Sequence, residues 1–266
     1  VGTSMKYQGC ERLAYEYAES FAQLGHSVAM TACSGSKPPD GVELIEVEQG
    51  GAEAEVKSLP AYKDRLKEFD VVYDLSHLHA AAQQGVPAIS IFWHDPVLAL
   101  YPEPKQNIVG ISQYAVRQFQ RYYKQPALHL DIIEVDAKLY CPSSEPVTDR
   151  YLFVGKMSVE KGALEAIRIA RKTGVELDVV GGLIDGEANR YSKLVEECCT
   201  GRIKFWGNVT DEEKIKLMQT AKAIIYPVGQ LEIHSHKSVE AMLCGCPVIT
   251  WDCGALREVI GTGGAA

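Results

Sequence analysis

Apolar residues recur along the chain with two different spacings, and each spacing predicts a kind of element. Between Glu11 and Leu24 they return every three to four residues and Gly25 follows, which predicts a helix that ends at the glycine. Short continuous runs such as 88–92 (AISIF) are typical of strands buried on both faces of a parallel sheet. The same reasoning predicts helices over 113–124, 160–173, 187–199, 210–221 and 236–244, and strands over 26–31, 71–73, 107–111, 151–154, 177–180, 203–206, 223–226 and 247–250.

Residues 142–149 (PSSEPVTD) interrupt this alternation with prolines, serines and acids, as a linker does. The βα series on either side predict two doubly wound α/β domains, one over 1–141 and one over 151–266, joined by a linker at 142–150. Ligands of such domains bind beyond the carboxyl ends of the strands, here in a cleft between the domains. A doubly wound domain normally opens with a strand, whereas this chain opens almost at once with a helix. We therefore expect segments to be missing at both ends.

Composition narrows the function classes. The net charge of −8 and the pI of about 5.4 argue against a nucleic-acid-binding protein. No basic and apolar leader opens the chain, and no apolar run is long enough to span a bilayer. The chain has eight cysteines, which we expect to be reduced thiols in a cytoplasmic protein, and Cys244, Cys246 and Cys253 do not have a zinc-site spacing.

Several common signatures are missing from the sequence. It contains no Gly-x-Gly-x-x-Gly after a strand, no phosphate-binding Gly-x4-Gly-Lys-Ser/Thr loop and no Gly-x-Ser-x-Gly elbow. These gaps argue against a Rossmann oxidoreductase, a P-loop enzyme and a typical hydrolase. The sequence also lacks an Asp-x-Asp pair, so we expect neither a metal nor another cofactor.

Three groups of polar residues are placed for chemistry. Lys156 and Lys161 lie five residues apart where a predicted strand gives way to a helix, a junction that suits phosphate. Glu232 and Glu240 are separated by eight positions across a loop and a helix, and ionised carboxylates accept several hydrogen bonds from hydroxyl groups. His94, like the pair His77 and His79, follows a predicted strand and is placed for polar groups of a substrate; His77 and His79 can equally support other site residues.

Motifs in the N-terminal half carry a family resemblance. Gln8-Gly9-Cys10-Glu11-Arg12 precedes the first helix, Leu24-Gly25-His26-Ser27-Val28 follows it, and Ile111-Ser112-Gln113-Tyr114 opens a later one. These segments resemble family 4 (group 1) glycosyltransferases, which have the GT-B architecture of two Rossmann-like domains facing a cleft. The resemblance implies that Gly9 contacts the donor and that His94 lies near the transferred sugar.

The C-terminal half carries the more specific part of the resemblance. Lys156 and Lys161 fall on the family's Arg and Lys, which hold the donor diphosphate. Glu232 falls on the glutamate that contacts the sugar hydroxyls, and Glu240 on the one that binds the ribose. The family's Gly-Phe-Gly after the first glutamate is Ile233-His234-Ser235 here, which places His234 and Ser235 at the donor and changes the shape of its pocket.

The resemblance implies an enzyme that moves a sugar from a nucleoside diphosphate sugar to a hydroxyl acceptor and retains the anomeric configuration. In this interpretation His94, Lys156, Lys161 and Glu232 carry the catalysis, and the two lysines stabilise charge that develops on the leaving diphosphate. A catalytically silent relative that binds a nucleotide or a protein partner is the main alternative, motivated by Lys156 and by the altered Gly-Phe-Gly. A sugar-nucleotide epimerase of the same shape is a second alternative.

Only one feature of the sequence bears on the identity of the acceptor. Arg117, Arg121 and Lys124 share a face of the predicted helix 113–124, beside aromatic residues. Such a face suits a phosphorylated or lipid-linked acceptor at a membrane surface, and it equally suits a solvated helix. The identity of the sugar, the acceptor and the oligomeric state are not encoded in any motif.

Overall fold

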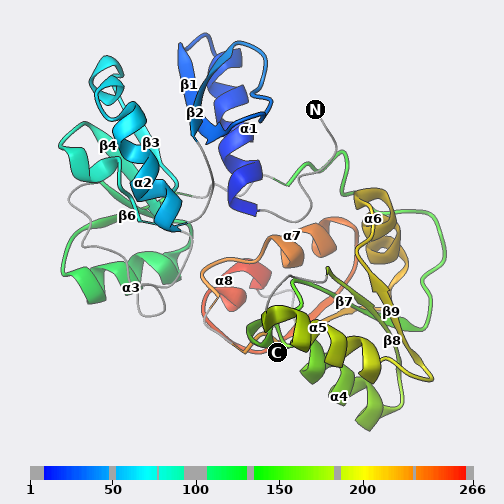
Figure 1. The fold of residues 1–266 in the computed structure, drawn as a ribbon. Coiled ribbons are helices and arrows are strands. Elements are labelled where there is room, and N and C mark those ends of the chain that lie inside the picture. The colour runs from blue at the N-terminus through cyan, green and yellow to red at the C-terminus, as the bar shows by residue number, and fades with distance from the viewer. Residues whose placement is uncertain are drawn as a thin grey trace. The chain divides into compact units, whose positions relative to one another are not determined.

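Every strand pair that the structure describes is parallel, as the short apolar runs predict. The computed structural model describes residues 9–47, 52–76, 78–92, 107–130, 135–182, 187–229 and 232–261. The chain divides into two compact units, residues 1–132 and 133–266, which Figure 1 shows from blue to green and from green to red.

The N-terminal unit has two sheets. One pairs β1 with β2, and the other has the strand order β3-β4-β5-β6. The strands are β1 (Val28–Cys33), β2 (Val42–Val47), β3 (Val72–Asp74), β4 (Ala88–Phe92), β5 (Ile108–Gly110) and β6 (Ala127–His129). The helices are α1 (Gly9–Gln23), α2 (Ala52–Tyr62) and α3 (Gln113–Tyr123), with short 3-10 turns at η1 (Arg65–Glu68) and η2 (Ala82–Gln84).

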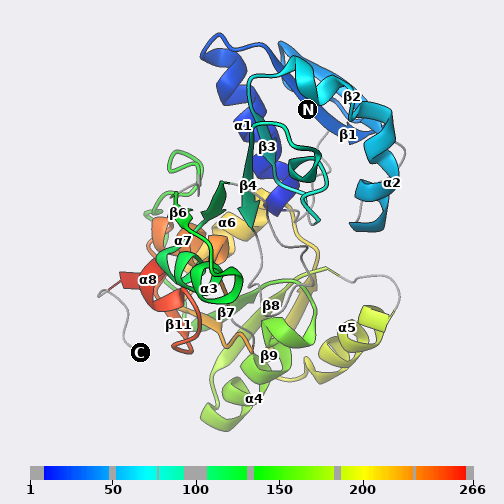
Figure 2. The ribbon, with the colours of Figure 1, turned by 90° about the vertical axis from the view of Figure 1, so that its left-hand side faces the viewer.

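Helix α1 packs on β1 and β2 (Figure 2), and α3 packs on β5 and β6. The aromatic residues of α3 differ in how far they are buried. Phe119 is fully buried against Phe92, and Tyr123 is also buried, whereas Tyr122 is exposed. Of Phe119, Tyr122 and Tyr123, only Tyr122 is therefore exposed together with the cations of α3.

The C-terminal unit has one five-stranded sheet in the order β11-β10-β7-β8-β9. Counted within the unit and read from the β9 edge, this is the order 3-2-1-4-5, which is the Rossmann order 3-2-1-4-5-6 without its sixth strand. The strands are β7 (Arg150–Val154), β8 (Glu176–Val180), β9 (Ile203–Gly207), β10 (Ile224–Tyr226) and β11 (Val248–Thr250). The helices are α4 (Ala163–Thr173), α5 (Glu187–Cys198), α6 (Asp211–Thr220), α7 (His236–Leu243) and α8 (Leu256–Ile260), with a 3-10 turn at η3 (Val159–Lys161).

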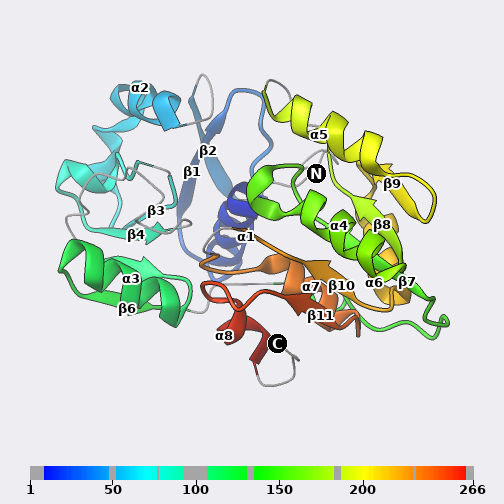
Figure 3. The ribbon, with the colours of Figure 1, turned by 90° about the horizontal axis from the view of Figure 1, so that it is seen from below.

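Right-handed crossovers place α4 and α5 on one face of this sheet and α6 and α7 on the other, as Figure 3 shows for α4, α5 and α7. The strands read as continuous apolar runs because helices cover both faces. Leu152, Phe153 and Val154 of β7, for example, are all at most 1% exposed. A large hydrophobic cluster of the described residues lies between these layers.

The structure corrects one predicted helix and adds elements that the pattern did not indicate. The helix predicted over 160–173 begins only at Ala163, because Gly162 has a φ of +79° and ends the preceding 3-10 turn. A side chain at 162 would collide with the carbonyl oxygen of Pro227, so a neighbouring loop imposes the break. Strands β2 and β6 and helix α2 were not predicted.

The segment between the two series of strands packs on the C-terminal unit. Tyr140 is 1% exposed within the core of that unit. The amide of Gln219 donates to the carbonyl of Cys141 at 2.8 Å, and the Thr148 N–H donates to the carbonyl of Thr220 at 2.8 Å. The expected linker at 142–150 remains a prediction, and its neighbours are anchored by these contacts.

Candidate functional site

Backbone hydrogen bonds draw several loops together at the carboxyl edge of the C-terminal sheet. The Gly155 N–H, after β7, donates to the carbonyl of Val180 at 3.0 Å. The Gly229 N–H, after β10, donates to the carbonyl of Glu160 at 2.8 Å. Because the strands are parallel, their carboxyl ends meet at this edge, and the polar residues that follow them share one region.

The sequence-predicted pair Lys161 and Glu232 lies in this region. The Lys161 ammonium contacts Oε1 of Glu232, although 71 positions separate them in the chain. The hydroxyl of Tyr226, at the end of β10, donates to the same Oε1 at 3.2 Å. Glu232 and Tyr226 are 8% and 4% exposed. A lysine and a phenol therefore fix one oxygen of a buried carboxylate.

The backbone of Glu232 is fixed as well. Its carbonyl accepts a hydrogen bond from the Ala255 N–H at 2.6 Å. Gly254, just before, has a φ of +64°, and a Cβ there would collide with that carbonyl oxygen. Only glycine tolerates both conditions, so the loop after β11 closes tightly on Glu232.

Glu240 is held from two helices. Helix α7 begins after Ser235, whose hydroxyl accepts a hydrogen bond from the Ser238 N–H at 3.2 Å as an N-cap. Glu240 follows in the second turn and is 6% exposed. Its Oε2 lies 3.2 Å from Nζ of Lys237 on the same helix and 3.4 Å from Nζ of Lys214 on α6.

These partners decide the charge of Glu240. Burial alone would raise the pKa of its carboxyl, but Lys237 and Lys214 outweigh burial and hold the pKa below its ordinary value. Burial likewise raises the pKa of the Tyr226 phenol, and the Glu232 carboxylate raises it further. Tyr226 therefore stays protonated and can donate to Glu232.

His234 lies between the two glutamates in sequence. Burial lowers the pKa of His234 to about 3, and the neighbouring His236, with its ring centre at 5.5 Å, adds to this effect. Its Nδ1 has no hydrogen-bond partner among the described residues. The structure thus places a neutral imidazole with an unused polar atom close to the start of α7.

The remaining predicted residues are distributed as follows. Lys156 is exposed just after β7, and Gly9 is the first residue of α1 in the N-terminal unit. His94 and His77 lie outside the described residues. His79 is 1% exposed and stacks on Phe92 at 4.1 Å, so it is a core residue of the N-terminal unit and not one that faces a substrate.

Sequence reasoning missed Tyr226, Lys237 and Lys214. Tyr226 ends the apolar run AIIY, and a polar tip at a strand end is the signal that could have identified it. Lys214 and Lys237 look like ordinary helix lysines in the sequence. Only the fold shows that Lys214 is buried.

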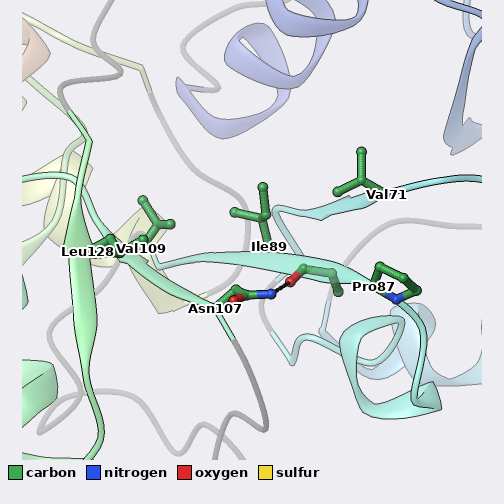
Figure 4. A pocket seen from close by; sticks show the side chains of 7 residues that line it. Val71, Pro87, Ile89, Asn107, Val109 and Leu128 are labelled. Atoms are coloured by element: carbon green, nitrogen blue, oxygen red, sulfur yellow. Dashed lines mark hydrogen bonds between the residues drawn. The ribbon is translucent and has the colours of Figure 1, made fainter.

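The hollow in Figure 4 belongs to a different part of the molecule. It has a volume of about 310 Å³ and lies on the β3-β4-β5-β6 sheet. Its lining is apolar apart from Asn107, whose amide donates to the carbonyl of Ala88 at 2.8 Å. None of the residues that the sequence predicts for the site lines this hollow.

The described residues contain no group of three or more His, Cys, Asp or Glu that could hold a metal ion. No helix among them is long and apolar enough to cross a membrane.

The sequence is similar to those of known glycosyltransferases. Residues 148–266 match the family described as "Glycosyl transferases group 1". The sequence is 26% identical to a phosphatidyl-myo-inositol mannosyltransferase of Mycolicibacterium smegmatis. This match covers 97% of the chain and 76% of the relative. The sequence is also 31% identical to an MMP α-(1→4)-mannosyltransferase of Mycolicibacterium hassiacum, in a match that covers 52% of the chain and 34% of that relative.

The fold has solved counterparts. The structure of Anabaena HepE in complex with UDP superposes on 98% of the chain with a TM-score of 0.77 at 16% identity, and the match covers 82% of HepE. The expected GT-B fold is thereby confirmed. The named relatives are enzymes, which gives no support to the alternative of a silent relative.

Proposed function

We propose that the chain is a group 1 glycosyltransferase that transfers a sugar from a nucleotide-sugar donor to a hydroxyl acceptor with retention of anomeric configuration; its GT-B fold and its similarity to named mannosyltransferases support this proposal. One observation carries the assignment of the site: Lys161 and Glu232, predicted to serve the diphosphate and the sugar, meet at the carboxyl edge of the sheet.

In this proposal Lys156 and Lys161 bind the donor diphosphate. Lys161 has three N–H donors, so it can keep its contact with Glu232 while it donates to phosphate. Lys156 is exposed and free to reach a ligand from solvent. The two cations stabilise negative charge on the diphosphate as the bond to the sugar breaks.

Glu232 orients the transferred sugar. Tyr226 and Lys161 both bind its Oε1, so Oε2 is the oxygen that accepts from sugar hydroxyls. Glu240 accepts from the ribose hydroxyls, and His234 extends the donor site with its unused Nδ1. Gly9 and His94 keep the donor-binding and catalytic roles that the family resemblance implies for them.

No side chain of the site is assigned as the base. In a retaining transfer the departing phosphate itself can take the proton of the acceptor hydroxyl while the new bond forms on the same face of the sugar. The lysines then serve a phosphate that is leaving group and base at once.

A donor panel tests the proposal. The purified chain is incubated with GDP-mannose, since two relatives are named mannosyltransferases, and with UDP-glucose, with which HepE has been solved. Release of GDP or UDP is measured, with and without simple alcohol and sugar acceptors, and the anomeric configuration of the product is read by NMR. We expect one donor to turn over with retention.

The Glu232→Gln variant tests the role of the carboxylate, because it keeps the shape of the side chain and removes its charge. It should bind the nucleoside diphosphate but turn over at least ten times more slowly, by loss of a charge-assisted bond of about 1.5–3 kcal/mol. Inversion of configuration would refute the retaining assignment. Binding without turnover of any donor would refute the proposed activity.

A further inference from the structure

Lys214 is a buried lysine, and its surroundings are unusual. Its side chain is 3% exposed, in helix α6. Its Nζ lies 3.0 Å from Asp211 Oδ1 and 3.4 Å from Glu240 Oε2, and 5.1 Å from the ring centre of Tyr140. Lysine is almost never fully buried unless it is paired. Here the pair is with the carboxylate assigned to the ribose.

Stability alone does not account for this lysine. Removing two charges from water costs about as much as their attraction returns, and apolar residues of similar volume often stabilise a fold equally well. The same helix also contributes Ile215 and Met218 to the hydrophobic core. What an apolar side chain at 214 could not do is fix the orientation and the charge of Glu240.

The contacts of Glu240 divide its two oxygens. Oε2 takes the shorter contacts, from Lys214 and Lys237. Among the described residues, Oε1 has the longer contact, at 3.5 Å from Nζ of Lys237. The oxygen with the weaker contact is the one that can exchange it for a hydroxyl.

We propose that Lys214 is a positioning residue for donor recognition: from α6 it anchors Oε2 of Glu240 and thereby leaves Oε1 oriented toward the ribose hydroxyls. This assignment rests on the proposed function, in which Glu240 binds the ribose. It adds a residue outside the family motifs to the determinants of the donor site. The exposed Asp211 pairs with the same ammonium, and the buried ring of Tyr140 lies beside it.

The test compares ribose with 2′-deoxyribose. UDP and GDP are titrated by calorimetry, and the tighter ligand is compared with dUDP or dGDP. Wild type should bind the ribonucleotide about 10- to 150-fold more tightly than the 2′-deoxy form, the range for one hydrogen bond to a charged group. In Lys214→Met this ratio should fall to within about threefold of unity. Lys216→Met, on the exposed face of α6, is the control and should keep the wild-type ratio.

The ratio separates positioning from structural support. A general loosening of the fold would weaken both nucleotides equally and leave the ratio intact, and this result would overturn the assignment. If Lys214→Met does not fold, Lys214→Gln keeps a donor and a similar length, and the same criterion applies to it. A wild-type chain that binds both nucleotides equally would refute the ribose role and with it the assignment of Lys214, while the transferase activity would stand on the donor panel. A wild-type chain that binds no nucleotide would refute the proposed function itself.

Discussion

Replacing Lys161 by methionine is the most direct test of how the site handles the donor diphosphate. The side chain is 23% exposed and contacts a carboxylate that is 10% exposed, so the ammonium is partly desolvated. Two unit charges 4 Å apart attract by about 1 kcal/mol in water and about 4 kcal/mol at an effective dielectric constant near 20. After exchange with water, a charge-assisted hydrogen bond is worth about 1.5–3 kcal/mol. Lys161→Met should therefore weaken binding of the nucleoside diphosphate about 10- to 150-fold.

The contact with Glu232 sharpens the prediction. In Lys161→Met, Glu232 keeps Tyr226 as its partner, and in Glu232→Gln the lysine loses its carboxylate. If the diphosphate needs the ammonium, Glu232→Gln should bind the nucleoside diphosphate at least as tightly as wild type does. The double variant should then bind as weakly as Lys161→Met. The extra affinity that the sugar contributes should disappear in Glu232→Gln.

Calorimetry with a nucleoside, its diphosphate and the nucleotide sugar measures all three effects. Lys172→Met removes an exposed lysine from the end of α4 and serves as the control for charge alone. Binding of the nucleoside, which has no phosphate, should be unaffected by Lys161→Met. An unchanged affinity for the diphosphate, or an equal loss for the nucleoside, would show that Lys161 serves only as the partner of Glu232.

Four further outcomes follow from the site. Tyr226→Phe removes one hydroxyl from Glu232 and should slow turnover about tenfold or more with diphosphate affinity unchanged, as initial rates and calorimetry will show. The pKa of His234 is about 3 in the folded chain against 6.5 in the unfolded one, so the unfolded state binds the proton first and stability falls as the pH drops below about 6.5. At pH 5 this pKa difference lowers the free energy of unfolding by about 2 kcal/mol. Urea unfolding should therefore show that His234→Gln loses about 2 kcal/mol less than wild type between pH 7 and pH 5, whereas His26→Gln, at an exposed position, should behave as wild type. Gly254→Ala should lower the melting temperature by several degrees, because its Cβ meets the carbonyl of Glu232. Transfer should survive EDTA, because cationic side chains are expected to neutralise the diphosphate; activity that EDTA abolishes and Mn²⁺ restores would contradict this.

Much of the C-terminal unit could be predicted because its pattern is local. Runs such as 151–154 and 223–226 are apolar throughout, and helices cover them on both faces. The N-terminal unit was harder. Strand β2 (VELIEV) carries glutamates at 43 and 46, which are three positions apart, and α2 contains Pro60, so neither element has the continuous or periodic pattern on which the prediction depended.

The candidate site was predictable in its residue types but not in its contacts. The sequence indicated Lys161 and Glu232 as members of one site, yet no spacing could show that they touch, because 71 positions lie between them. The break in the helix at Gly162 could not be predicted either, because it also depends on a residue that is distant in the sequence. Its cause is the carbonyl of Pro227, which only the folded chain brings close.

The segment Ile233-His234-Ser235 departs from the family pattern, and the structure shows how its side chains are held. Ile233 and Ser235 are each 4% exposed, and the Ser235 hydroxyl caps α7. The Nδ1 atom of His234 has no hydrogen-bond partner among the described residues, and the low pKa of this side chain makes it neutral at physiological pH. A neutral imidazole can donate to one ligand group without adding positive charge to the proposed donor site. In the proposed function, the departure therefore changes the shape and the hydrogen bonding of the donor pocket, whereas Lys161 and Glu232 keep the charges that the transfer requires.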